Sequence, residues 1–334
     1  MGTNNTKEKI NIRSALILSV VSLVFSLVPI ILGPENLFIS ILPISISAGI
    51  LASLVYFECE RTSLPKIVTP VAIILMDWIF NGFYSLTGIL LVVSALMIFL
   101  VYEQGWSKFE SSMAMSIIVA VMIALLFLAI GAKNNQGLTS VEYYKSFYEQ
   151  FKNEYIVQYN EIALPIYEEA GIEPISAEEI IYSFDYAAAL LVSMLFAVGF
   201  VLIGIASKTY SFVLKKLGSD SDKLVKWKFL PSTIFAYFYV IVEFLIMFSG
   251  SEFTTYNLSI ANLSAIFTTI FLYYGFVAVR KLIKERRKRG MPIALTVICA
   301  IAITLVLPRI ISYAGVFYCI IGNKIKKMKD SHID

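Results

Sequence analysis

Four polar side chains interrupt long apolar stretches of this sequence, at positions where they could bind a solute or an ion. Asp77, Glu243 and Arg309 are ionisable, and Asn262 is an uncharged companion. An ionisable group inside a bilayer is costly unless it is paired or hydrated, so each is a candidate functional residue. Asn81 lies one helical turn after Asp77 and completes the candidate polar set.

Three interpretations of this polar set are open. The two carboxylates could lie near the membrane interface and hydrogen-bond to water or to neighbouring side chains. The set could line a cavity that binds a small solute or a cation from outside. Arg309 could instead form a buried ion pair with one carboxylate and serve only the structure. A proton relay has little support, because the single histidine, His332, lies in the C-terminal tail.

The sequence lacks the motifs of common enzymes. It has no phosphate-binding loop that ends in Gly-Lys-Ser/Thr, no His or Cys set at metal-ligand spacing and no nucleophile elbow. Cys59, Cys299 and Cys319 lie in or beside apolar stretches and are expected to be packing residues without disulfides. We therefore expect no catalytic residue, no metal, no cofactor and no nucleic-acid partner. A membrane-embedded enzyme is the least favoured functional class.

The composition predicts the elements that position these residues. Of 334 residues, 58% are hydrophobic and only 15% are charged, and the mean hydropathy is +0.78. Soluble domains are closer to a quarter charged, so we expect an all-α, polytopic bundle in the lipid bilayer. Eight apolar stretches are predicted to be spans, at about residues 14–32, 37–57, 67–83, 86–102, 111–132, 186–207, 229–248 and 258–279.

Lys and Arg in the short loops predict the orientation of these spans. If the spans alternate in direction, every basic loop falls on one side, and the loop at residues 280–289 is the most basic. That side is expected to be the cytoplasm, with the N-terminus on it, in the inner membrane of a bacterium. The basic run at residues 280–289 is a topology anchor or a site for anionic lipid or an acidic partner.

The C-terminal apolar stretch, residues 291–322, allows two structures. Pro308 breaks it, because proline lacks the N–H that a helix interior needs. It is either one kinked span or a helical hairpin, and only the hairpin returns the basic tail, residues 324–334, to the cytoplasm. The chain then has four parts: a membrane half (1–133), an insert (134–185), a second membrane half (186–323) and the tail (324–334).

The insert between the fifth and sixth spans is the one long stretch that does not suit a bilayer. It carries ten acidic residues from Glu142 to Asp185 and two lysines. Residues 141–162 have the spacing of an amphipathic helix that Pro165 limits, and Ser176-x-x-Glu179 is a capping box that starts a helix continuing into the sixth span. The insert is expected outside the cytoplasm.

One face of the predicted insert helix carries an aromatic stripe. Its members are Tyr144, Tyr148, Phe151, Tyr155 and Tyr159. Tyrosine favours the headgroup region of a membrane, so the helix is expected to lie near the ends of the spans. The stripe either packs on the protein's own bundle or forms a lid over an outward-facing cavity.

The first span has small residues at positions that let two helices approach closely. Ala15-x-x-x-Ser19 and Ser22-x-x-x-Ser26 have the spacing of a helix-packing face. This face either packs inside the bundle or docks on a partner protein.

The order of these features resembles the YybS-like bacterial integral membrane proteins, a family of unknown function. The resemblance covers nearly the whole chain: five spans, an acidic outside helix, and a sixth span that leads into a basic loop. Three short motifs follow, Trp227-Lys-Phe-Leu-Pro231, Leu272-Tyr-Tyr-Gly-Phe276 and Leu307-Pro-Arg309. The resemblance implies a fold and no catalytic residues.

That family is distantly similar to the substrate-binding membrane subunits of energy-coupling-factor transporters. Those subunits bind a small solute near the outer face and dock on a partner through alanine-spaced small residues. This chain has Ser19, Ser22 and Ser26 after Ala15 in that place. The resemblance implies a transport-type component that captures a small solute, has no ATPase of its own and relies on an ATPase or membrane partner. The alternative is a scaffold of envelope assembly or cell differentiation that acts through protein contacts.

Overall fold

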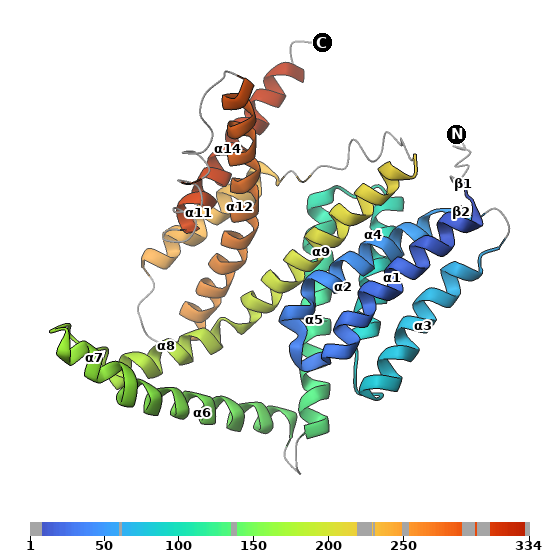
Figure 1. Cartoon of the computed structure of the whole chain (residues 1–334). Coiled ribbons are helices and arrows are strands. Elements are labelled where there is room, and N and C mark those ends of the chain that lie inside the picture. Colours follow the sequence, from blue (N-terminus) through green and yellow to red (C-terminus); the bar gives the residue numbers. More distant parts are fainter. Residues whose placement is uncertain are drawn as a thin grey trace. The chain divides into compact units, whose positions relative to one another are not determined.

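The computed structural model describes residues 9–59, 62–134, 139–218, 229, 231–248, 254–288, 298 and 308–330. Nearly all of these residues are helical (Figure 1). The elements are β1 (Lys9–Ile10), α1 (Ile12–Leu32), η1 (Pro34–Asn36), α2 (Leu37–Tyr56), β2 (Glu58–Cys59), α3 (Leu64–Asn81), α4 (Thr87–Glu103), α5 (Lys108–Asn134), α6 (Ser140–Gln158), η2 (Tyr159–Ala163), α7 (Leu164–Glu169), α8 (Ala177–Ala189), α9 (Leu191–Lys216), α11 (Thr233–Met247), α12 (Thr255–Lys288) and α14 (Pro308–Asp330). β1 and β2 form a short parallel pair. The expected all-α class is confirmed.

The helices have the length and composition of membrane spans. Among the described residues, six helices are long and apolar enough to cross a bilayer: α1, α2, α3, α5, α9 and residues Thr255–Glu285 of α12. The shorter helices α4 and α11 are also apolar. Large aliphatic and aromatic side chains on the outer faces are exposed, Ile31 by 71% and Ile79 by 79%. Such broad apolar exposure suits lipid contact, and the chain is a multi-pass helical membrane protein.

The eight predicted spans all coincide with helices, but two of these helices are short. α4 has 17 residues and α11 has 15. At 1.5 Å per residue, a helix of this length covers less than the roughly 30 Å of a typical hydrocarbon core. The count of eight spans therefore stays a prediction. Much of the basic loop between α9 and α11 lies outside the described residues, and so do residues 299–307. The prediction of one kinked span or a helical hairpin falls on this second stretch.

The helices form two compact units. The N-terminal unit contains residues 1–187 and 195–228, and the C-terminal unit contains residues 188–194 and 229–334. From Leu195 onward, α9 therefore packs with the first five membrane helices rather than with the later ones. The four-part division expected from the sequence stays a prediction.

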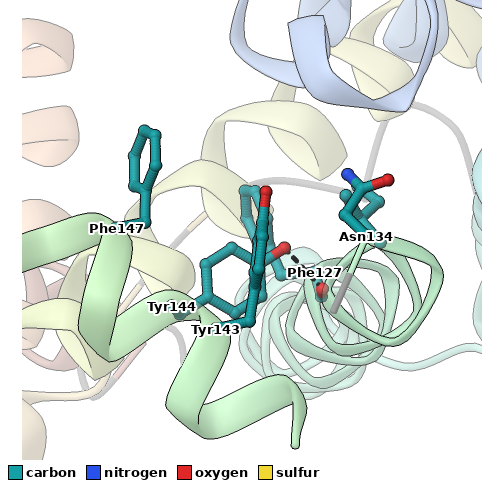
Figure 2. Close-up of a pocket in the computed structure, with 6 residues that line it drawn as sticks. Phe127, Asn134, Tyr143, Tyr144 and Phe147 are labelled. Atoms are coloured by element: carbon teal, nitrogen blue, oxygen red, sulfur yellow. Dashed lines mark hydrogen bonds between the residues drawn. The ribbon is translucent and has the colours of Figure 1, made fainter. Parts of the chain in front are cut away.

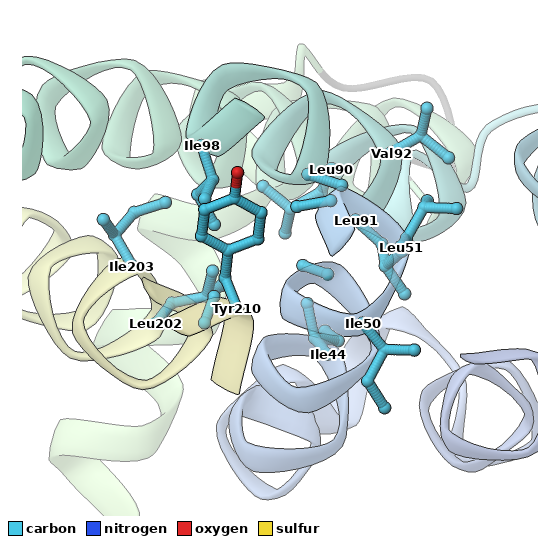
Figure 3. Packing of buried hydrophobic residues seen from close by; sticks show 14 of the residues in the cluster. Ile44, Ile50, Leu51, Leu90, Leu91, Val92, Ile98, Leu202, Ile203 and Tyr210 are labelled. Carbon is cyan, nitrogen blue, oxygen red and sulfur yellow. The ribbon is translucent and has the colours of Figure 1, made fainter. Parts of the chain in front are cut away.

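The core of the N-terminal unit lies between α2, α4, α5 and α9. Figure 3 shows apolar side chains of this cluster from α2 (Ile50 and Leu51), α4 (Leu90 and Leu91) and α9 (Leu202, Ile203 and the fully buried Tyr210). Two glycines let α9 come close. A Cβ at Gly49 would lie 2.5 Å from the Ala206 carbonyl oxygen, and one at Gly199 would lie 2.7 Å from the Ser116 carbonyl oxygen. Glycine is needed at both crossings because any side chain would push α9 away.

The small-residue face of α1 packs inside this unit. Ala15, Ser19, Ser22 and Ser26 are all buried. The Ser22 and Ser47 hydroxyl oxygens lie 3.0 Å apart, and the Ser47 hydroxyl donates to the Ser22 carbonyl oxygen at 2.8 Å. Of the two roles that the spacing allowed, packing against α2 is the one that the structure shows.

The C-terminal unit is built on a backbone contact between α12 and α14. A Cβ on Gly275 would collide with the Ile311 carbonyl oxygen, and a Cβ on Gly315 would collide with the Phe271 carbonyl oxygen. Aromatic rings fill the space around this crossing: Tyr239 stacks on Phe271 with ring centroids 5.3 Å apart. Gly275 belongs to the Leu272-Tyr-Tyr-Gly-Phe276 motif, so this motif has a packing role in the C-terminal unit.

A second motif contacts the first within this unit. The Phe229 ring lies 4.9 Å from the Tyr273 ring in an edge-on arrangement. The Cys319 thiol donates to the Pro231 carbonyl oxygen at 3.2 Å, which joins α14 to the start of α11. Pro308 begins α14, where a missing N–H costs nothing.

Replacing Gly275 with alanine should destabilise the C-terminal unit. The new methyl group meets backbone rather than a flexible side chain, so α12 and α14 must separate at a cost of about 1–3 kcal/mol. The measurement is the melting temperature of the purified protein in detergent. Gly322→Ala is the matched control, since nothing lies within 4 Å of its added Cβ. Equal melting temperatures for the two variants would contradict the backbone contact.

Candidate functional site

Asp77 lies buried in the N-terminal unit and joins α3 to the start of α4. Its side chain is 1% exposed. Oδ1 accepts hydrogen bonds from Asn81 Nδ2 at 3.0 Å and from the Ser85 hydroxyl at 2.7 Å. Oδ2 accepts from the Gly88 backbone N–H at 2.8 Å. Both carboxylate oxygens are therefore satisfied by the protein itself.

The position of Asp77 explains why a carboxylate is tolerated there. Gly88 is in the first turn of α4, whose backbone N–H groups lack partners within the helix and carry the positive end of the helix dipole. A carboxylate at that end satisfies one of these donors and is stabilised by the dipole. A Cβ at Gly88 would lie 3.1 Å from the Asp77 Cβ, so glycine leaves room for this contact.

Asn81 extends the hydrogen-bond network to α1. Its Nδ2 also donates to the Ile30 carbonyl oxygen at 2.9 Å, one of the acceptors near the end of α1. The prediction that Asp77 and Asn81 belong to one polar cluster agrees with these contacts. The cluster links the ends of α1 and α3 to the start of α4.

A cavity of about 250 Å³ opens beside this cluster. Its polar wall contains Asn81, Tyr84, Ser85 and Lys133, and its apolar wall contains Ile31 and Ile130. In the described part of the chain, Asn81 Oδ1 has no hydrogen-bond partner, so it remains an acceptor next to the cavity. Lys133, in the last turn of α5, brings the positive charge. Asp77 does not line the cavity but holds two residues that do.

Glu243 lies in the C-terminal unit, at the contact between α11, α12 and α14. The Ser264 hydroxyl donates to Oε1, and the Tyr313 hydroxyl donates to Oε2 at 2.7 Å. Tyr313 in turn stacks against the buried Tyr239, whose hydroxyl lies 3.0 Å from the Thr268 hydroxyl. This carboxylate is half-buried and is held by hydroxyl groups of α12 and α14.

Asn262 has a different role from the one expected. Its Oδ1 accepts from the Ser193 backbone N–H at 3.1 Å, and its Nδ2 donates to the Ala189 carbonyl oxygen at 2.8 Å. Leu190 interrupts the helix between α8 and α9, so this amide joins a carbonyl before the break to an N–H after it. Asn262 and Ser264 are two residues apart on α12 and so point to different faces of the helix. Asn262 therefore faces the break and not Glu243.

Arg309 is the second residue of α14, and its side chain is exposed. It lies close enough to Tyr239 and Tyr313 to act on them electrostatically. A buried Arg309–carboxylate pair, one of the three alternatives, does not agree with this exposure. Asp77 and Asn81 belong to one unit and Glu243, Asn262 and Arg309 to the other, so the single five-residue site stays a prediction.

The insert forms an arm of α6, η2, α7 and α8 (Figure 1). Its aromatic stripe packs within the N-terminal unit. The rings of Tyr148, Phe151 and Tyr155 surround Phe184 of α8 at centroid distances of 6.4, 5.9 and 5.1 Å. The Tyr144 hydroxyl donates to the Phe127 carbonyl oxygen of α5 at 2.6 Å. The stripe thus contacts the protein's own helices, and the lid interpretation stays a prediction.

Charged contacts strengthen the pairing of α6 with α8. Lys152 Nζ lies 2.9 Å from Glu149 Oε2 and 3.5 Å from Asp185 Oδ1. The Tyr148 hydroxyl donates to Asp185 Oδ1 at 3.0 Å. Burial, and to a smaller extent this hydrogen bond, raises the pKa of Tyr148 to about 12.

Pro165 does not end the helix of the insert as expected. The chain widens instead into the π-turn η2, in which the Leu164 N–H bonds to the Tyr159 carbonyl oxygen, and it remains helical through α7. The widened turn relieves the clash that proline causes with the preceding turn. Tyr159, the last member of the stripe, is buried here, and its hydroxyl accepts from the Ile175 N–H at 2.8 Å.

The predicted capping box at the start of α8 is confirmed. The Ser176 N–H and hydroxyl donate to Glu179, and the Glu179 N–H donates back to the Ser176 hydroxyl oxygen. The same arrangement at Thr139 and Glu142 starts α6 and was missed, although its Thr-x-x-Glu spacing is visible in the sequence. Hydrogen bonds from the Thr139 backbone and hydroxyl hold the pKa of Glu142 below its usual range.

Sequence reasoning also missed the partners that define the candidate site. Ser85, Gly88 and Lys133 are ordinary residues whose roles depend on how α3, α4 and α5 meet.

Among the described residues, no group of three or more His, Cys, Asp or Glu side chains could hold a metal ion. No protein-family model, curated protein or solved structure matches this chain.

Replacing Asp77 with asparagine should destabilise the N-terminal unit. An amide NH₂ would face either the Gly88 N–H or the donors of Asn81 and Ser85, which leaves buried donors without an acceptor. The expected loss is about 1.5–3 kcal/mol, seen as a lower melting temperature in detergent. Glu178→Gln makes the same charge change at an exposed position. If Asp77→Asn and Glu178→Gln have the same melting temperature, Asp77 has no such structural role.

Proposed function

We propose that this protein is a non-enzymatic membrane component that captures a small solute from outside the cell and has no ATPase of its own. The observation that carries the proposal is the cavity beside Asn81, Ser85 and Lys133. Its volume of about 250 Å³ is just below the roughly 300–1,000 Å³ of typical ligand pockets, which restricts the solute to a small molecule. Under the proposed topology, with the N-terminus in the cytoplasm, this cavity opens at the outer face.

The cavity wall favours a solute with an anionic group. Lys133 offers an ammonium group, and Tyr84 carries a hydroxyl group that can donate or accept. The Ser85 hydroxyl donates its hydrogen to Asp77, so towards the cavity it is an acceptor. Asn81 Oδ1 adds an acceptor, so the site can also bind a hydroxyl or amine of the solute. Asp77 lies behind the wall and accepts three hydrogen bonds there, so Lys133 is the charged residue of the cavity wall itself.

A transport role would need an energy-coupled partner, and an ATPase module of the membrane is the partner class that we propose. The small-residue face of α1 is buried against α2, so it does not supply the docking surface. The resemblance to YybS-like proteins in a bacterial inner membrane belongs to the same proposal and is supported by the order of segments in the sequence.

A scaffold function is the second candidate, and one observation favours it. The end of the arm exposes several aliphatic side chains, with Ile162 exposed by 64% and Ile166 by 61%. Exposed apolar groups on a polar, acidic segment are typical of protein contacts. Pull-down from membranes separates the two functions, because a transport component should retain an ATPase module and a scaffold should retain envelope-synthesis proteins.

Replacing Lys133 with glutamine should weaken binding of an anionic solute without lowering stability. Removing a charged hydrogen-bond donor costs roughly tenfold or more in affinity. The measurement is ligand-induced thermal stabilisation with a panel of small carboxylates and phosphate monoesters. Lys145→Gln, which removes an exposed lysine of the arm, is the matched control.

Two results would contradict the proposed function. One is that no member of the panel stabilises the wild-type protein. The other is that Lys133→Gln binds every ligand of the wild type with unchanged affinity. Lys145→Gln must bind the ligands with wild-type affinity. Only then can a loss of affinity in Lys133→Gln be assigned to the cavity.

A further inference from the structure

A second cavity, of about 300 Å³, lies where α5 meets the arm. Figure 2 shows Tyr143, Tyr144 and Phe147 projecting from α6 and Phe127 and Asn134 from the end of α5. Ile130 completes the lining. Four of the six lining residues are aromatic, and none of the six is charged. This cavity is separate from the one lined by Lys133, although Ile130 contributes to both.

The aromatic rings are arranged as walls rather than as a stack. The Tyr144 ring stands at 89° to the Phe127 ring, with centroids 6.3 Å apart. It stands at 77° to the Tyr143 ring, with centroids 5.2 Å apart. Perpendicular rings present both a face and an edge to a shared space. The face of an aromatic ring is negative and attracts a cation within about 6 Å of the centroid.

The rings are held in place before any ligand arrives. The Tyr144 hydroxyl donates to the Phe127 carbonyl oxygen, which fixes α6 to the end of α5. The Thr139–Glu142 capping box fixes the first turn of α6, immediately before Tyr143. Such preorganisation lowers the entropic cost of binding. Phe147 remains 60% exposed, so the cavity stays open on one side.

The arm that supplies three of the lining residues is acidic. It carries ten acidic residues against Lys145 and Lys152 between Glu142 and Asp185, which is a net charge of −8 over that segment, while Lys133 and Lys145 lie next to lining residues in the sequence. The net negative charge of the arm raises the local concentration of cations. The walls contain no carboxylate, so they suit a cation whose charge is spread over methyl groups better than a metal ion or a primary ammonium.

We propose that the cavity lined by Phe127, Tyr143, Tyr144 and Phe147 binds a quaternary or methylated ammonium group. The rings replace the weak hydration of such a group, and Asn134 can accept or donate a hydrogen bond at the rim. A free organic cation and a choline lipid headgroup share this chemistry. The site is independent of the anionic solute of the proposed function.

The test is a choline titration of the full chain in phosphatidylglycerol nanodiscs, followed by saturation-transfer NMR. The comparison ligand is 3,3-dimethylbutan-1-ol, which has the shape of choline but no charge. Choline should bind at least about tenfold more tightly than this alcohol, because only the cation is attracted to the ring faces. Tyr143→Ala and Phe147→Ala should each weaken choline binding by at least about threefold. Phe83→Ala, an exposed aromatic outside the cavity, is the matched control and should bind as the wild type does.

Repeating the titration in phosphatidylcholine nanodiscs distinguishes the two sources of the ligand. Loss of free choline binding there indicates that the lipid headgroup occupies the cavity, and unchanged binding indicates a free cation. Lys133→Gln should not weaken choline binding, which separates this site from the proposed anion cavity. The proposal is overturned if choline does not bind in phosphatidylglycerol, if the neutral alcohol binds equally well, or if both aromatic variants bind choline as the wild type does.

Discussion

The structure depends on one constraint: in lipid, the chain must satisfy its own polar groups, because water is absent from the hydrocarbon core. Helices satisfy the backbone except at their ends and breaks. Asp77 meets an N–H in the first turn of α4, and Asn81 meets a carbonyl near the end of α1. Asn262 bridges the break between α8 and α9. Three of the residues first considered as solute ligands therefore satisfy backbone groups at helix ends and breaks.

The same constraint explains why close packing is concentrated at glycine and serine. Lipid tails are as apolar as leucine, so helices in a bilayer associate through van der Waals contact and hydrogen bonds rather than through hydrophobicity. Gly275 and Gly315 bring α12 and α14 into backbone contact, and Gly49 and Gly199 do so for α9. Ser22 and Ser47 add hydrogen bonds between α1 and α2. Of these contacts, those of Ser22 and Gly199 involve α1 and α5, whose ends line the cavity.

Hydropathy and capping motifs predict the local elements of this chain well, because both depend on neighbouring residues. The positions of the eight apolar helices and the capping box at Ser176 follow from the sequence. The partners of Asp77 do not, since Ser85 and Gly88 meet it only after α3 and α4 have packed. The effect of Pro165 does not follow either, because a π-turn absorbs a proline that would otherwise break the helix. Phe184, the partner of the aromatic stripe, lies on another helix and has no periodic signal.

The structural carboxylate Asp77 lies behind a cavity that we propose opens outward. The most direct test of this outward opening is the accessibility of Tyr84→Cys to a membrane-impermeant maleimide in intact cells, with the wild type as the control for native cysteines. Ser63→Cys, at the opposite end of α3, reports the other side of the membrane. We predict labelling at position 84 without permeabilisation and at position 63 only after it. Labelling at position 84 only after permeabilisation would contradict capture of a solute from outside.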